Sequence, residues 1–78
     1  MISEYVEQAL ERANYRKVDG EYCATVAGLK GVIAMGESLE SCRRHLVDVI
    51  EEWILVRVAK GMKIPALGSS TIRVRKAS

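Results

Sequence analysis

The sequence predicts an α+β fold in the order α-β-β-β-α-β, with a small antiparallel sheet packed on a long helix. Three observations lead to this prediction. Two stretches repeat apolar residues at helical spacing. Between them, side chains alternate as in β-strands, in short runs separated by glycines. In a last short stretch apolar and polar residues alternate again. At 78 residues the chain is expected to form a single domain, 1–78. A core of this size is marginal by itself, so a partner subunit is expected to supplement it.

The N-terminal stretch has apolar residues separated by three, one, three, one and three positions, which is the stripe of a helix facing a core. These residues are Ile2, Tyr5, Val6, Ala9, Leu10 and Ala13. Ser3 is suited to cap the helix, and Glu4 follows where the positive helix end favours an acid. The first helix is therefore predicted over residues 3–13.

Three short strands are predicted next, with glycine-containing turns between them. The strands cover residues 15–18, 21–27 and 32–35, and the turns are Asp19-Gly20 and Gly28-Leu-Lys-Gly31. Alternation along the middle strand places Tyr22, Ala24 and Val26 on one face and Cys23 and Thr25 on the other. The glycines are therefore interpreted as corners of a small sheet.

A long second helix is predicted to begin after Ser38 and to end at Gly61. Its apolar residues are spaced three, four, three, four and three positions apart, which indicates one continuous buried seam. The seam consists of Leu39, Cys42, Leu46, Val49, Trp53 and Val56. A connector then leads to a final strand at residues 70–75, where Ile72 and Val74 alternate with polar residues.

The end of this helix is more apolar than one sheet face requires. Nearly every residue of the segment WILVRVA, 53–59, is apolar, so its surface must be covered by the first helix, another copy of the chain or a different protein. We therefore expect an obligate oligomer, a homodimer or a homotetramer. Trp53 could fill the core, anchor an interface or do both. The candidate interface residues are Tyr22, Trp53, Ile54, Leu55 and Val58.

The sequence contains no recognisable catalytic or metal-binding constellation. His45 is the only histidine and has no evident acid or nucleophile partner, so no enzyme activity and no cofactor are expected. Cys42, His45 and Cys23 would leave a structural zinc site one ligand short, so no metal is expected. Gly31 is followed by Val32 and a strand instead of the Lys-Ser or Lys-Thr of a phosphate-binding loop.

The composition is typical of a cytoplasmic globular domain, with a net charge of +2, two cysteines and no long apolar run. Basic residues nevertheless suggest an alternative function. Arg73, Arg75 and Lys76 could contact phosphates, and Lys30 lies in a GLKG segment that matches the GxxG loop of RNA-binding KH domains. The competing interpretation of the C-terminal basic residues is that their charge protects a strand edge from aggregation. The competing interpretation of the GLKG segment is a plain hairpin turn.

Residues 14–67 resemble the HicB-like antitoxin family. The matching features are Asp19-Gly20 with Tyr22, Gly31 after a short turn, Gly36 followed by Ser38-Leu39-Glu40, and the closing Gly61 with Ile64-Pro65. The resemblance implies a partial ribonuclease-H-like fold, with the N-terminal helix as a variant of short, stand-alone members. It also implies a binding function, in which the protein masks the surface of a small RNA-cleaving toxin of the HicA type.

The chain departs from the family pattern at two places. Ala27-Gly28-Leu29-Lys30-Gly31 lacks the prolines that many members carry before this last glycine. Many members also continue into a DNA-binding domain, for which too few residues follow Pro65, so direct DNA binding is not expected. A family member that has lost its toxin partner would show the same features and remains an alternative.

Overall fold

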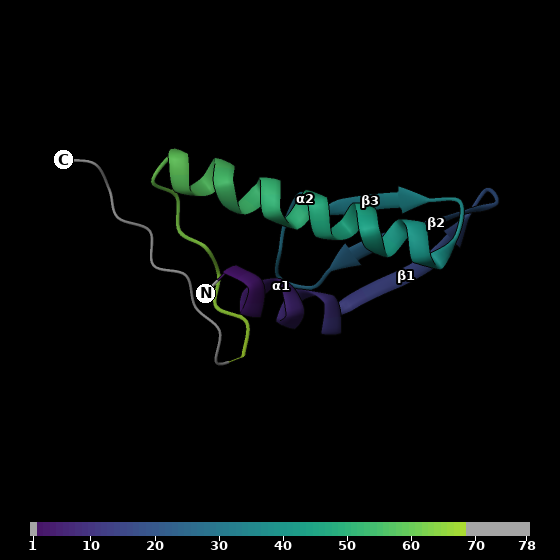
Figure 1. The fold of residues 1–78 in the computed structure, drawn as a ribbon, viewed down its shortest axis with the longest axis horizontal. Coiled ribbons are helices and arrows are strands. Elements are labelled where there is room, and N and C mark those ends of the chain that lie inside the picture. Colours follow the sequence, from purple (N-terminus) through teal and green to yellow (C-terminus); the bar gives the residue numbers. More distant parts are fainter. Residues whose placement is uncertain (1, 69–78) are drawn as a thin grey trace.

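The computed structural model describes residues 2–68, and it has the order helix, three strands, helix (Figure 1). The elements are α1 (Ile2–Glu11), β1 (Ala13–Val18), β2 (Glu21–Val26), β3 (Ile33–Gly36) and α2 (Leu39–Ala59). The strands form an antiparallel meander in the order β1-β2-β3. The α+β fold predicted from the sequence is therefore confirmed, while the final strand predicted at 70–75 lies outside the described residues.

The first hairpin turns at the two residues that the sequence indicated. Asp19 and Gly20 have φ angles of 50° and 83°, as the tight turn between twisted strands requires. The turn fixes the register of β1 against β2, in which Tyr15 pairs with Ala24 and Lys17 pairs with Tyr22. Residues that pair in this way share a face of the sheet.

Helix α1 differs from its prediction at both ends. It already includes Ile2, so Ser3 lies within the first turn and the predicted cap at Ser3 is wrong. Its end is marked by a hydrogen bond from the Arg12 amide to the Ala9 carbonyl at 3.1 Å. Ala13 belongs to β1 instead of the helix, because it pairs with Val26 across the sheet.

Helix α2 has well-formed caps at both ends. Ser38 and Ser41 form a reciprocal capping box, each side chain accepting a hydrogen bond from the other residue's backbone amide. At the C-terminal end Gly61 adopts a φ of 66°, and the Met62 amide donates to the Arg57 carbonyl at 2.9 Å. This closing pattern is the Schellman motif, and it explains why the helix ends before Gly61.

The core lies between the helices and one face of the sheet. Helix α2 packs along β3 and β2, and α1 packs beside α2 (Figure 1). The buried residues of α2 are Cys42, Leu46, Ile50 and Ile54, four positions apart. The predicted seam is therefore partly wrong: Leu39 and Val56 are exposed, while Ile50 and Ile54 take the central places.

The segment after α2 folds back onto α1. Ile64 and Leu67 are buried in the same core, and the Tyr5 hydroxyl donates a hydrogen bond to the Pro65 carbonyl. Burial raises the pKa of the Tyr5 phenol above its ordinary value, although the positive charge of Arg57 acts in the opposite direction. None of the helices within residues 2–68 is long and apolar enough to cross a membrane.

Because the Tyr5 phenol is buried, the stability of the protein is expected to fall at alkaline pH. Because its pKa is raised in the folded state, its contribution is complete below about pH 10, the pKa of an unfolded tyrosine, and is lost as pH rises through the folded pKa. We expect Tyr5→Phe to cost about 0.5–1.5 kcal/mol at pH 8 through loss of the hydrogen bond to Pro65. At pH 11 the variant should fall less in stability than the wild type does. Denaturant unfolding of both proteins at pH 8 and pH 11 checks this. Equal losses of unfolding free energy between the two pH values in the variant and the wild type would contradict it.

Candidate interaction surfaces

One exposed stripe runs along α2 on its solvent side. Its residues are separated by three, four and three positions, so they lie on one face of the helix. They are Asp48, Glu51, Leu55 and Val58, and all are exposed. We call this set the α2 stripe: its N-terminal half is acidic and its C-terminal half is apolar. Leu55 is the most open of the large apolar side chains that are exposed in the described residues, with 63% of its surface accessible.

The sequence-derived interface candidates do not form one surface. Leu55 and Val58 are exposed on the α2 stripe. Ile54 is completely buried in the chain's own core, so the expectation that it needs a second chain is corrected. The reason is that residue 54 continues the buried line of Cys42, Leu46 and Ile50, whereas residue 55 lies about 100° further around the helix.

Trp53 is half-buried and holds the turn between β2 and β3 against α2. Its indole Nε1 donates a hydrogen bond to the Lys30 carbonyl at 3.1 Å. The Arg57 guanidinium lies over its ring, 4.4 Å from the centroid, and also donates to the Lys63 carbonyl at 2.9 Å. Trp53 therefore connects the turn between β2 and β3 to the helix, and Arg57 connects the segment that follows α2. The sequence had left this structural role open.

Tyr22 lies at the opposite end of the sheet from Trp53. It pairs with Gly36, which approaches the first turns of α2 near Cys42, while Trp53 is three helical turns further along. Its ring is half-buried beneath the Lys17 ammonium, 5.7 Å from the ring centroid. Tyr22 thus belongs to a separate region from the apolar end of the α2 stripe.

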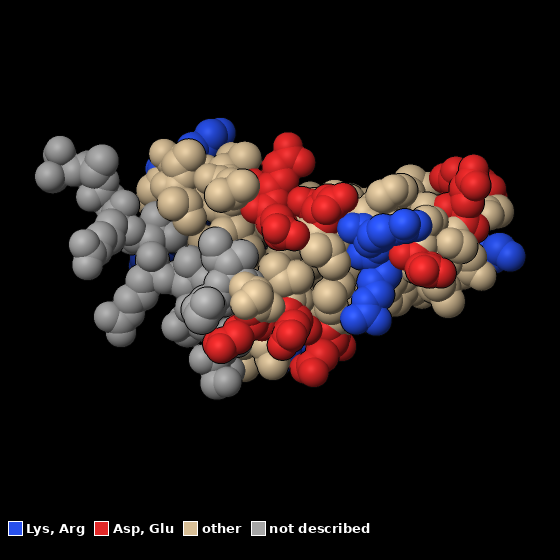
Figure 2. Space-filling view, viewed as in Figure 1, with Lys and Arg blue, Asp and Glu red and all other residues tan. Residues whose placement is uncertain are grey.

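Acidic side chains gather over α1 and over the middle of α2 (Figure 2). The exposed acids of these segments include Glu7 and Glu11 in α1 and Asp48, Glu51 and Glu52 in α2. Arg73, Arg75 and Lys76 lie outside the described residues, so the acids concentrated over these two segments are the main charged feature of the face in this view. Of the residues in the nucleic-acid alternative only Lys30 is described, and it is exposed in its turn.

Two hollows near the start of α2 share Arg43 as a lining residue. One, of about 400 Å³, is lined by Tyr15, Leu39, Glu40 and Arg43. The other, of about 370 Å³, is lined by Glu7, Leu10, Glu11 and again Arg43. Each hollow is lined by both apolar and charged side chains, and none of these lining residues is buried.

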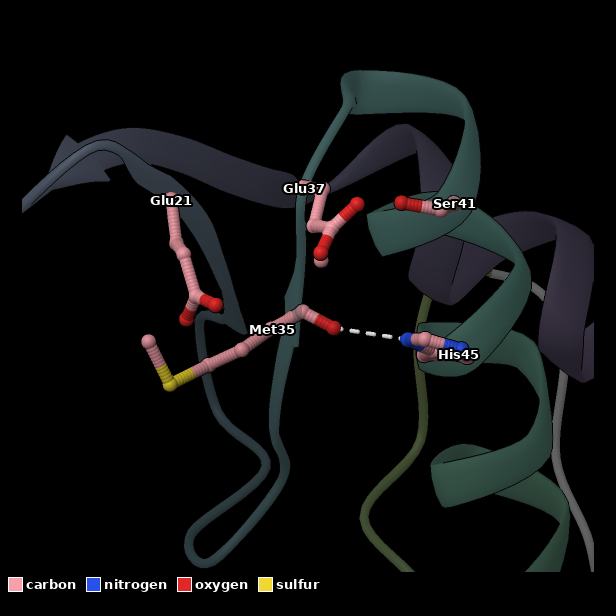
Figure 3. Close-up of a pocket in the computed structure, with 6 residues that line it drawn as sticks. Glu21, Met35, Glu37, Ser41 and His45 are labelled. Atoms are coloured by element: carbon pink, nitrogen blue, oxygen red, sulfur yellow. Dashed lines mark hydrogen bonds between the residues drawn. The ribbon is translucent and has the colours of Figure 1, made fainter.

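A third hollow places a histidine, a serine and two carboxylates together (Figure 3). The ring of His45 contacts the Met35 carbonyl through Nδ1 at 2.7 Å. The Ser41 hydroxyl is engaged with Ser38 at the helix cap, and no hydrogen bond joins it to His45 in the described residues. These side chains therefore form a structural arrangement around the helix start, without the nucleophile–base contact that acyl transfer requires.

The two cysteines occupy different environments. Cys42 is buried, and its thiol lies 3.7 Å from the Ala34 carbonyl; burial raises its thiol pKa, with a smaller effect from nearby Cys23. Cys23 is half-buried on the other face of the sheet. Within residues 2–68 no three histidine, cysteine or acidic side chains come together in a group suited to a metal ion.

Comparison with known proteins identifies the family. A family model described as UPF0150-like matches residues 4–65, most of the chain. The chain belongs to the UPF0150-like family. Among solved structures it is similar to TTHA0281 from Thermus thermophilus, with 34% sequence identity and a TM-score of 0.86 over 96% of this chain and 95% of that one. No curated protein matches it.

The UPF0150-like match extends the region inferred from the sequence. It begins inside α1 and ends at Pro65, so it includes both helices and the whole described sheet. The resemblance noted from the sequence began only at residue 14 and treated the first helix as an addition. In this UPF0150-like chain α1 belongs to the matched unit, and its Tyr5, Val6 and Ala9 form part of the core.

Proposed function

We propose that this UPF0150-like protein is a HicB-type antitoxin, which binds a small RNA-cleaving toxin of the HicA type and blocks its surface. The observation that carries the proposal is the family match over residues 4–65, because the UPF0150-like family is associated with HicB-like proteins of toxin–antitoxin systems. The fold agrees with this assignment, since it is the small helix-and-meander unit expected of such proteins.

The described surface supports a basic protein partner. A toxin that binds RNA needs positive charge at its active surface, because phosphate contacts dominate RNA affinity. The α2 stripe offers Asp48 and Glu51 for attraction and Leu55 and Val58 for apolar burial, along one face of the helix. Acids speed the encounter of opposite charges, and buried apolar side chains slow dissociation.

The proposed action is occlusion, without bond chemistry in the antitoxin itself. The partner would lose its RNA substrate because the α2 stripe covers the surface that the substrate needs. On this proposal the protein requires no cofactor, and it works in the reducing compartment that two free cysteines suit. Self-association into a homodimer or homotetramer would increase the number of toxin molecules held by one assembly.

The test is co-expression of the protein with the small basic protein encoded beside its gene. We expect the pair to copurify and the ribonuclease activity of the partner to be suppressed. Leu55→Asp and Val58→Asp should weaken the complex at least tenfold, because each buries a charge in the apolar half of the stripe. Leu39→Asp, at an exposed leucine in the first turn of α2 and outside the α2 stripe, is the matched control and should leave toxin affinity unchanged.

Two results would contradict the proposal. One is a folded neighbour protein that neither binds this chain nor loses ribonuclease activity in its presence. The other is direct binding of RNA by the purified chain, steeply weakened by salt, which would favour the nucleic-acid alternative that includes Lys30.

A further inference from the structure

The sheet has a second face that the helices leave uncovered. Because side chains alternate, the residues between the buried Ala24, Val26 and Ala34 point away from α1 and α2. The strand register arranges them in rows across β1, β2 and β3: Asn14, Thr25 and Ile33; Arg16, Cys23 and Met35; Val18 and Glu21. We call these eight residues the open face.

The open face is more apolar than a solvated sheet face normally is. Antiparallel sheets with one wet side usually carry polar residues there. Here Ile33, Met35 and Val18 are 57%, 45% and 40% exposed, and Cys23 lies at the centre of the rows. Strand β3 is therefore apolar on both faces, which is expected where a second surface covers the outer one.

We propose that a second copy of the chain covers the open face, forming a two-fold dimer in which the sheets pack face to face. This proposal is independent of toxin binding and assigns self-association to a surface other than the α2 stripe. The charged half of that stripe is acidic, which suits a basic partner better than an identical chain. The open face instead carries both signs, with Arg16 and Glu21 on either side of Cys23.

The arrangement of these charges is self-complementary. Val18, Cys23 and Ile33 lie on one diagonal of the rows. Strands lie about 4.8 Å apart and alternate residues about 6.8 Å apart along a strand, so a two-fold axis along this diagonal crosses the strands of the two sheets at about 70°. This is closer to the orthogonal than to the aligned sheet packing. Each residue on the diagonal then faces its own counterpart, and Arg16 lies over the partner's Glu21 while Glu21 lies over the partner's Arg16. A two-fold interface requires this reciprocity.

The size of the open face sets the expected strength of the dimer. Stable interfaces usually involve about 20–30 residues on each side, and this face offers fewer. We therefore expect a reversible dimer whose fraction rises with protein concentration. Sedimentation equilibrium of the full chain over a concentration series measures that fraction directly.

The decisive experiment exchanges the two charges. Arg16→Glu alone should place one acid against the partner's Glu21 in each of the two symmetry-related pairs and shift the chain toward monomer, with at least a tenfold weaker dimer. The double variant Arg16→Glu with Glu21→Arg should restore dimerisation, because the opposite pairs are recreated in reverse. Because Arg16 and Glu21 are also diagonal neighbours across β1 and β2 of one chain, denaturant unfolding of every variant is measured alongside, and Arg16→Glu must remain folded as a monomer. Ile33→Glu should also give monomer, while Leu55→Asp on α2 should leave the dimer intact.

Cross-linking gives a second readout on the wild-type chain. Packed sheets lie about 10 Å apart, too far for a direct disulfide between the two Cys23 residues but within reach of a short bismaleimide. We expect rapid cross-linking through Cys23, abolished by Cys23→Ser and unaffected by Cys42→Ala. Three results would overturn the proposal. The wild type could be a monomer at every concentration, the double variant could stay monomeric, or the dimer could be lost in Leu55→Asp but kept in Ile33→Glu.

Discussion

Replacing Ile54 with alanine is expected to lower the free energy of unfolding by about 2–5 kcal/mol, as for other large-to-small changes at fully buried sites. Ile54 has no accessible surface and lies in the core that α2 shares with the sheet and α1. Removing three side-chain carbons there leaves a cavity that the rigid neighbouring elements cannot fill. Denaturant titration followed by circular dichroism measures the loss.

The neighbouring residue provides the matched control. Leu55 is equally apolar and adjacent in sequence, but 63% of its surface is exposed. Leu55→Ala should change the stability of the isolated chain by no more than about 0.5 kcal/mol, because surface substitutions remove few contacts. Equal losses at the two positions would contradict the assignment of Ile54 to the core and Leu55 to the surface.

Gly36→Ala is expected to destabilise the protein by several kcal/mol, roughly the cost of overpacking a rigid site or more. A Cβ at residue 36 would lie 2.5 Å from the Cys42 backbone nitrogen and 2.7 Å from its Cα. Backbone atoms in a capped helix cannot move aside as the tip of a flexible side chain can. The end of β3 and the start of α2 must therefore separate, which weakens the contact between the long helix and the sheet.

Gly28→Ala separates this steric effect from the ordinary cost of replacing glycine. Gly28 has a φ of 88°, but a Cβ there meets nothing within 4 Å. Its replacement should cost about 1–2 kcal/mol through the left-handed backbone alone. Thermal unfolding of both variants under one condition compares them, and a smaller loss for Gly36→Ala would show that β3 and α2 are less tightly apposed than in this structure.

The local elements were accessible from the sequence because short-range chemistry specifies them. Asp19-Gly20 favours positive φ angles, Ser38 caps a helix, and Gly61 ends one, whatever the chain packs against. The order of helix, three strands and helix follows from these turn and cap residues together with the apolar periodicity. The errors in where these elements lie in the chain concerned their boundaries, such as Ser3 at the start of α1 and Ala13 at its end.

The orientation of α2 was not accessible in the same way. From Trp53 to Ala59 the helix is apolar on most of its circumference, so spacing alone allows several buried lines. The predicted seam included Leu39 and Val56, which are exposed, and omitted Ile50 and Ile54, which are completely buried. Packing against β3 selected the line that contains Cys42, because the close approach at Gly36 fixes how the helix is rotated.

The same distinction applies to the candidate surfaces. Sequence periodicity alone identified an excess of apolar residues near the end of α2, and the turn pattern indicated a HicB-like resemblance over residues 14–67. Only the tertiary structure decided that Ile54 belongs to the core, that Trp53 holds a loop, and that Ile33, Met35 and Cys23 share an uncovered sheet face. The physical reason is that turns and caps depend on neighbouring residues in the chain, whereas exposure depends on which surfaces remain after distant elements have packed.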